Sequence, residues 1–301
     1  MEFTLHGKEI SDPWRWLEDL DGPETRAWVE SQNQRTFAFL ETIPQREGIR
    51  RRITELWNYS RCSLPFKEGG RYFCFRNDGL QNQSVLHVSD RLDAPSKILL
   101  DPNTLSSDGT VALAGTSPSR DGRLIAYGLS GAGSDWEEWH VRDVETGLDL
   151  GDQVRWVKFS SISWTQDGKG FFYCRYDAPN AGDEFESQNY FHKLYYHRIG
   201  QPQSEDQLFY HRPDHKEWNF SANVSDDGRY LILHVWAATN YNLLFYCDLE
   251  AKGPVTELIS EFEARYQFIG NDGPVFWLQT DLEAPRGRVI AVDTARTGPE
   301  S

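Results

Sequence analysis

The sequence predicts a mainly β protein: an incomplete β-propeller of about five blades, preceded by a short α-helical N-terminal segment. Three observations support this fold class. Residues 1–57 carry helix start signals and apolar side chains at helical spacing. After Trp57 the apolar residues follow a period of two, as in strands. One turn-and-strand pattern then recurs five times, which is typical of propeller blades.

The N-terminal segment is predicted to be helical throughout. Ser11-Asp12 before Pro13 is a helix start. A side-chain oxygen of a capping residue can accept a hydrogen bond from a free backbone N–H of the first turn, and proline is tolerated there because its missing N–H would have no partner in the helix. The tetrapeptide Asp-Gly-Pro-Glu at 21–24 is a second start, and its helix must end before Pro44. A third helix has apolar residues at positions i, i+4, i+7 and i+8: Ile49, Ile53, Leu56 and Trp57.

The repeat is a polar turn that ends in glycine, followed by an aromatic-rich strand. Its copies are "KEGGRYFCF", "SRDGRLIAYG", "TQDGKGFFYC", "SDDGRYLILHV" and "GNDGPVFWLQ". Their last glycines lie about 45 to 60 residues apart: Gly70, Gly122, Gly168, Gly228 and Gly273. Glycine tolerates the positive φ of a tight turn, and a second strand follows each copy. We therefore expect an N-terminal helical segment at 1–57 and a partial propeller at 58–301. The alternative, a β-sandwich of hairpins, does not require a repeat.

The composition excludes some classes of partner. The chain has 301 residues, a net charge of −15 and a pI of about 5.0. Because like charges repel, we expect neither nucleic acid nor an anionic membrane surface as partner. No apolar run is long enough to span a bilayer, and the N-terminus does not resemble a signal peptide. These features favour a cytoplasmic protein.

The four cysteines are predicted to be reduced and packed thiols. Cys62, Cys74, Cys174 and Cys247 form no C-x-x-C pair, and three of them lie in strand-like apolar runs. This pattern favours neither a disulfide framework nor a zinc site.

The stretch "YGLSGAGSDW" at 127–136 poses the question of a serine nucleophile. A nucleophile elbow requires G-x-S-x-G between a strand and a helix. Neither Ser130 nor Ser134 has that context, since the residues on both sides are strand-like. We expect an inter-strand loop here and no catalytic residue.

No metal site and no cofactor are predicted. His211 and His215 have helical metal-ligand spacing, but Pro213 between them indicates a loop. The "SDDG" at 225–228 resembles the start of a calcium loop, yet it lacks the spaced ligands and the final glutamate. A turn is the simpler interpretation.

Several blocks, in order, resemble the prolyl oligopeptidase family. They are "SDPWRWLEDLDGPETRAWVESQN", "GLQNQSVL", "LDPNTLSSDGTVAL", "YGLSGAGSDW", "VKFSSISWTQDGKGFFY", "KLYYHRIGQPQSED" and "SDDGRYLI". The resemblance covers nearly the whole chain. It implies a serine peptidase that cuts short peptides after proline, with a seven-bladed propeller covering an α/β-hydrolase domain and filtering substrates by size. Residues 1–57 are then the N-terminal piece of that hydrolase domain.

The same resemblance implies that the catalytic serine, aspartate and histidine lie in a C-terminal part that this sequence does not include. No G-x-S-x-G occurs in the chain. The sequence therefore predicts no peptidase activity for this chain alone. Its expected partners are short proline-containing peptides and the missing C-terminal α/β-hydrolase domain.

Four candidate substrate-pocket residues follow from the resemblance. Phe159 matches the phenylalanine of the family's "KFS" block, Asn219 stands where the family has a methionine, and Trp236 and Thr239 replace an arginine and a cysteine. Three of the four differ from the family, so the pocket's identity stays open. Core packing is the alternative for Phe159. A rival function is a stand-alone β-propeller binding module, but the apolar N-terminal segment would then lack a partner.

Overall fold

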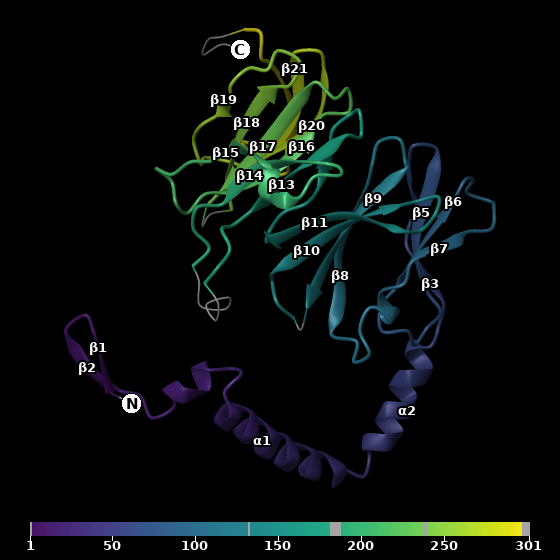
Figure 1. The fold of residues 1–301 in the computed structure, drawn as a ribbon, viewed down its shortest axis with the longest axis vertical. Helices are drawn as coiled ribbons and strands as arrows, with labels where there is room; N and C mark the ends of the chain where they lie inside the picture. Colours follow the sequence, from purple (N-terminus) through teal and green to yellow (C-terminus); the bar gives the residue numbers. More distant parts are fainter. Residues whose placement is uncertain (1, 132, 181–187, 238–239, 297–301) are drawn as a thin grey trace. The chain divides into compact units, whose positions relative to one another are not determined.

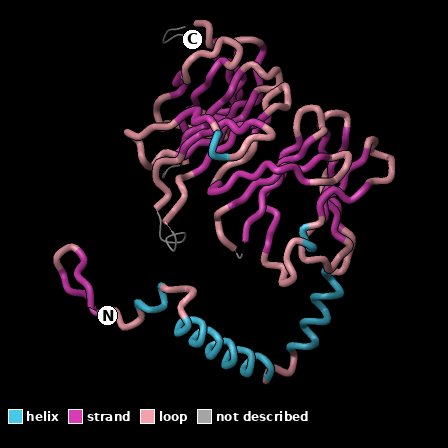
Figure 2. The backbone as a smooth tube through the Cα atoms, viewed as in Figure 1, coloured by secondary structure: helices cyan, strands magenta, loops and turns pink. Residues whose placement is uncertain are grey.

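The computed structural model describes residues 2–131, 133–180, 188–237 and 240–296. The chain divides into two compact units: Met1–Tyr59 with Asp78–Leu80, and Ser60–Asn77 with Gln81–Ser301. The long helices belong to the first unit, and the second is built almost entirely of strands (Figures 1 and 2). The mainly β fold class is therefore confirmed.

The first unit opens with a β-hairpin, so the prediction of a helical start was wrong. Strands β1 (Glu2–Leu5) and β2 (Lys8–Ser11) pair antiparallel, with Leu5 opposite Lys8. The two-residue turn uses His6 and Gly7 at φ 49° and 76°. Positive φ at both turn residues matches the right-handed twist of the strands, and this is what favours a hairpin. Histidine is an unusual first residue for such a turn, which hid the signal.

The predicted helix after Pro13 is reduced to one 3₁₀ turn, η1 (Arg15–Glu18). The carboxylate of Asp12 accepts a hydrogen bond from the Trp14 N–H at 2.9 Å, but the N-cap residue of η1 is Trp14 and no side chain caps this turn. The helix does not continue because Gly22-Pro23 begins the next one. A single turn fixes several dihedral angles for few hydrogen bonds, and only a longer helix recovers that cost.

The other two predicted helices are confirmed. Helix α1 (Pro23–Glu41) starts with proline after an N-cap glycine and ends before Pro44. Helix α2 (Arg46–Trp57) carries the predicted apolar face, and all four of its members are exposed in this chain: Ile49, Ile53, Leu56 and Trp57.

The second unit contains five consecutive antiparallel blades. Blade 1 has β3 (Arg61–Cys62), β4 (Phe66–Glu68), β5 (Arg71–Asn77), β6 (Val85–Ser89) and β7 (Lys97–Leu100); blade 2 has β8 (Val111–Pro118), β9 (Leu124–Gly131), β10 (Glu137–Asp143) and β11 (Asp149–Val157). Blade 3 has β12 (Ser163–Trp164), β13 (Gly170–Arg175), β14 (Lys193–Arg198) and β15 (Gln207–Tyr210); one pair, Val157 with Arg175, joins it to blade 2.

Blade 4 has β16 (Asn219–Val224), β17 (Tyr230–Trp236), β18 (Asn242–Asp248) and β19 (Thr256–Ile259). Blade 5 has β20 (Tyr266–Asp272), β21 (Val275–Thr280) and β22 (Arg288–Asp293). Two short 3₁₀ turns, η2 (Pro102–Thr104) and η3 (Gln203–Glu205), lie between strands. The number of blades agrees with the repeats in the sequence.

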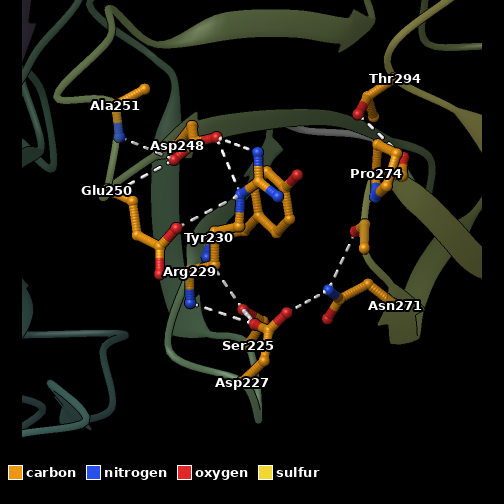
Figure 3. A network of polar contacts seen from close by, with 11 residues as sticks. Ser225, Asp227, Arg229, Tyr230, Asp248, Glu250, Ala251, Asn271, Pro274 and Thr294 are labelled. Atoms are coloured by element: carbon orange, nitrogen blue, oxygen red, sulfur yellow. Dashed lines mark hydrogen bonds and ion pairs between the residues drawn. The ribbon is translucent and has the colours of Figure 1, made fainter.

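The repeated glycine turn lies between the first two strands of each blade, or directly before β5 in blade 1. All five glycines have positive φ, between 54° and 81°. Three copies share one hydrogen-bond pattern, which Figure 3 shows for blade 4. There the Ser225 hydroxyl donates to Asp227 at 2.5 Å, and the same carboxylate accepts from the Arg229 N–H at 3.1 Å. Asp227 also accepts from the side-chain amide of Asn271 at 2.7 Å, which ties the turn to blade 5.

The core lies between blades. Four clusters of buried residues each combine side chains from two consecutive blades. On β13, Phe171 and Tyr173 pack toward blade 2, whereas Phe172 and Cys174 pack toward blade 4. Because successive side chains of a strand point to opposite faces, one strand serves two interfaces. This arrangement explains why the central strands are apolar on both faces.

None of the residues that the structure describes covers the outer face of blade 5. Trp277 is 44% exposed, and Ile269 and Val289 beside it on the neighbouring strands are also exposed. Their alternates on β21, Phe276 and Leu278, are fully buried against blade 4.

The cysteines are free thiols, as predicted, but not all are packed. Cys74, Cys174 and Cys247 are buried on strands, whereas Cys62 is exposed. Cys62 differs because its strand, β3, has only two residues and lies at the edge of blade 1.

A buried ionic cluster of His197, Asp206 and Asp152 connects blade 3 to blade 2. His197 is fully buried between Asp206, 2.7 Å from Nδ1, and Asp152, 3.1 Å from Nε2. Tyr173 donates to Asp206 at 2.7 Å, and Gln203 hydrogen bonds both to Tyr173 and to the backbone of Arg155. Burial lowers the pKa of His197, but the hydrogen bonds to the two carboxylates outweigh it and raise the pKa to about 9.

Replacing Gly228 by alanine is expected to lower the free energy of unfolding by about 2 kcal/mol, because a left-handed residue with a side chain costs about 1–2 kcal/mol. Its φ is 77°, and an added Cβ would lie 2.5 Å from the Cβ of Gln166. Gly253→Ala is the control, since that glycine has open space and no positive φ. Equal urea midpoints for the two variants would contradict the turn's role.

The protonated His197 should stabilise the protein fully below pH 6.5, the ordinary histidine value, and the contribution should disappear as the pH rises through about 9. We expect a loss of about 3 kcal/mol over this range, since one pKa unit corresponds to about 1.4 kcal/mol. In urea titrations, His197→Gln should have a lower free energy of unfolding than the parent at pH 6. Its free energy of unfolding should also change less between pH 6 and pH 9. The exposed His211→Gln should behave like the parent; a parallel pH dependence in H197Q would refute the assignment.

Candidate functional site

A groove of about 510 Å³ opens where β8, β12 and β16 begin. These are the first strands of blades 2, 3 and 4, and we call them the inner strands. Three consecutive blades line it. Blade 2 contributes β8 and the β9–β10 hairpin, the loop before β12 belongs to blade 3, and β16 belongs to blade 4. Its lining residues are Ala112, Ala114, Ser130, Ser134, Asp135, Glu137, Phe159, Ser160, Ser161 and Ser221. The repeated glycine turns follow the other ends of the same inner strands.

Ser130 and Ser134 line the groove as structural residues. Ser130 lies on β9, and its hydroxyl donates to the carbonyl of Ser134 at 2.5 Å. The hydroxyl of Ser134 accepts from the Trp136 N–H at 3.1 Å, which tightens the turn into β10. Strand follows strand here, unlike in a nucleophile elbow.

Phe159 is the apolar element of the groove. Its φ is 56°, a left-handed conformation that is rare for a bulky residue, and its side chain is 48% exposed. A strained backbone that holds a large apolar side chain in solvent is not explained by core packing. Such strain is often found at binding sites, where the surrounding structure maintains it.

The surroundings of Phe159 keep it in place. The preceding residue, Lys158, is buried, and its ammonium lies 4.5 Å from the ring centre of Trp136 and 5.7 Å from that of Phe159. Asn189 accepts a hydrogen bond from this ammonium at 3.3 Å. Trp136 in turn packs edge-on against Trp156 at 5.6 Å. The cation and the rings thus form a rigid support under the groove.

Asn219 and Trp236 are brought together, but they do not line the groove. They face each other as antiparallel partners on β16 and β17. The hydroxyl of Tyr176 donates to the Asn219 side-chain oxygen, and the ring of Tyr176 stacks on His192 at 4.5 Å. Ser221, two residues after Asn219, does reach the groove. Thr239, the fourth predicted residue, lies outside the described residues.

The buried histidine beside this pair is neutral. Burial lowers the pKa of His192 to about 3, and its Nδ1 accepts the backbone N–H of Phe220 at 3.0 Å. This neutral ring, stacked between Tyr176 and Phe220, packs blade 3 against blade 4.

The polar lining of the groove is acidic and rich in hydroxyl groups. Asp135 is exposed, and burial raises the pKa of Glu137, although its hydrogen bond from the Trp139 indole at 2.7 Å opposes this. Among the residues that the structure describes, no histidine, lysine or arginine lines the groove. Among the described lining residues the groove offers carboxylate and hydroxyl groups for hydrogen bonding, and no serine hydroxyl is paired with a histidine or lysine base.

The sequence reasoning missed Asp135, Glu137 and Ser221 as groove residues. Asp135 lies in "YGLSGAGSDW", one of the blocks that carry the family resemblance. Its position in the groove could not be predicted, because the groove forms only where three blades meet. The histidines with metal-ligand spacing are separate from the groove: His215 stacks on Trp218 at 3.8 Å. No group of three potential metal ligands occurs in the described part of the chain.

Comparison with known proteins gives this fold a family. The family model of the prolyl oligopeptidase N-terminal β-propeller domain matches residues 1–301. The chain belongs to the prolyl oligopeptidase family. Among the residues described, no helix has the length and apolar character to cross a bilayer.

Relatives of known sequence support the same family. A prolyl endopeptidase of Elizabethkingia miricola is 38% identical over 99% of this chain, and a dual function macrocyclase-peptidase of Galerina marginata is 32% identical over 97%. The match covers 42% and 43% of those proteins, so the chain spans less than half the length of these relatives.

A solved structure agrees. Prolyl oligopeptidase B from Galerina marginata, bound to a 35mer hydrolysis and macrocyclization substrate, superposes with a TM-score of 0.84 at 30% identity. The match covers 96% of this chain and 43% of that one. This chain is therefore similar to the N-terminal propeller portion of a longer enzyme.

Replacing Phe159 by glycine should change the free energy of unfolding by no more than about 1 kcal/mol, because relief of the left-handed strain offsets the lost contacts of a half-exposed ring. Phe172→Ala, at a buried ring between blades 3 and 4, should cost about 3–5 kcal/mol. Denaturant titrations compare the two. A comparable loss in both variants would show that Phe159 is an ordinary core residue.

Proposed function

We propose that this chain is the substrate-contacting propeller portion of a proline-specific serine oligopeptidase, which hydrolyses short peptides after proline. The names of the relatives, prolyl endopeptidase and macrocyclase-peptidase, support the reaction class. In this account the chain binds part of the peptide, and a C-terminal α/β-hydrolase domain supplies the serine, histidine and aspartate. The chain alone is inactive.

The observation that carries the proposal is Phe159. It projects from a strained loop into a groove at the start of the inner strands, and a buried lysine and two tryptophans hold that loop. An exposed ring on a rigid support offers an apolar side chain of a peptide a large contact area at a low entropy cost. We propose Asn219, Trp236 and Thr239 as further substrate contacts, although the first two do not line the groove itself.

The other end of the inner strands supports a role in limiting substrate size. Arg120 follows the end of β8, and its guanidinium donates to the Val224 carbonyl at 3.2 Å. It pairs with Asp226 at 3.2 Å and with Glu68 at 3.9 Å. One side chain thus connects blades 1, 2 and 4 at the glycine turns. We propose that peptides enter at the end of the inner strands where the groove lies. The linked glycine turns at the opposite end of these strands restrict the entry of larger substrates.

Uncovered apolar surfaces support a larger protein. In the first unit, Trp14 and Phe39 are mostly exposed, and so is the apolar face of α2. In the second, the outer face of blade 5 exposes Trp277. Surfaces of this kind mark interaction sites. We assign residues 1–57 to the hydrolase domain and 58–301 to the propeller, with further blades packing on blade 5.

The acidic composition and the free cysteines favour the cytoplasm.

The purified chain should bind a neutral blocked peptide, acetyl-Ala-Phe-Gly-Pro-amide, with a Kd of about 1 mM or tighter. It should leave a Gly-Pro amide substrate intact. Phe159→Ala should weaken binding about fivefold or more, because the ring supplies the apolar contact. Tryptophan fluorescence reports binding, and an amide-release assay reports hydrolysis.

Phe191→Ala is the matched control, because Phe191 is 45% exposed, has a φ of 60° and does not line the groove. The proposal is wrong if no peptide binds, if both variants bind like the parent, or if a protease-free preparation cleaves the substrate.

A further inference from the structure

The polar side of the groove carries negative charge that no cation of the lining balances. Asp135 has no ion pair or hydrogen-bond partner for its carboxylate among the described residues, and Glu137 receives one hydrogen bond, from Trp139. The contrast is with Glu138 next to them. Its carboxylate pairs with Arg155 at 2.7 Å and with His140 at 3.0 Å.

The uncharged part of the lining adds acceptors. The hydroxyls of Ser161 and Ser221 have no protein partner in the described part of the chain, and each offers two lone pairs to the groove. The hydroxyl of Ser130 already donates to a carbonyl, so its lone pairs also remain. A ligand group that brings several N–H donors and a positive charge satisfies this set.

Two neighbouring cations, Lys158 and Arg155, are engaged elsewhere. Arg155 pairs with Glu138 at 2.7 Å. The ammonium of Lys158 is committed to Asn189 and to the face of Trp136, and Lys158 does not line the groove. Its side chain is only 8% exposed, so a bound peptide contacts the carboxylates and not this ammonium.

We propose that Asp135 and Glu137 are specificity-determining residues that select peptides with a positively charged group, while Phe159 holds a neighbouring apolar side chain. This inference rests on the proposed peptide-binding function of the groove. The group is a primary ammonium, either the free N-terminus of the peptide or a lysine side chain. In both cases the ion pair forms at partly exposed carboxylates, where it strengthens binding about fivefold.

Three peptides of one length test the proposal with the 301-residue chain. They are acetyl-Ala-Phe-Gly-Pro-amide, the same peptide with a free N-terminus, and acetyl-Lys-Phe-Gly-Pro-amide. We expect one or both cationic peptides to bind about fivefold tighter than the neutral one at low salt. The tighter of the two identifies the source of the ammonium. The advantage should shrink toward onefold at about 0.5 M NaCl, because salt screens partly exposed charges.

The double variant D135N/E137Q should bind the three peptides with equal affinity, because the charge that distinguishes them is removed. Glu261→Gln, at an exposed carboxylate outside the groove, should leave the preference intact. Equal binding of neutral and cationic peptides by the parent, or a preference that survives in D135N/E137Q, overturns the charge selection and leaves the proposed function standing. If the parent chain binds none of the three peptides, both the charge selection and the proposed function are wrong.

Discussion

The structure depends on one constraint: each inner blade must bury both of its faces against its neighbours. Blades 2, 3 and 4 meet this condition through buried clusters that each draw on two blades. The alternation of side chains along a strand makes this possible, since Phe171 and Phe172 serve opposite interfaces. The order of the blades along the chain then fixes which loops become neighbours, and so builds the groove from parts of three blades.

The same constraint explains the surfaces left open. Among the described residues, blade 5 has a neighbour on one face only, and the other face exposes Trp277, Ile269 and Val289. A stack of blades without closure ends in such a face, because each blade presents two apolar sides. The ionic cluster around His197 and the link from Asp227 to Asn271 add polar connections between blades, which specify how neighbours align rather than how much apolar area they bury.

Much of the propeller could be predicted because its signals are local. Gly122, Gly168 and Gly228 each follow an aspartate in a turn that demands positive φ, and the strands after them alternate. The hairpin at the N-terminus escaped prediction because His6 takes a conformation usually left to asparagine or glycine. The groove escaped for a different reason. The left-handed φ of Phe159 and the presence of Asp135 and Ser221 in one groove arise from packing between blades, which no local pattern encodes.

The central claim is that this chain is one portion of a longer proline-specific peptidase. The most direct measurement is to sequence the transcript beyond the codon for Ser301. The account predicts that the reading frame continues through further blades, which cover Trp277, into a segment with G-x-S-x-G between a strand and a helix. A stop codon directly after Ser301 would contradict it, and the blades would then have to be explained as a binding protein in their own right.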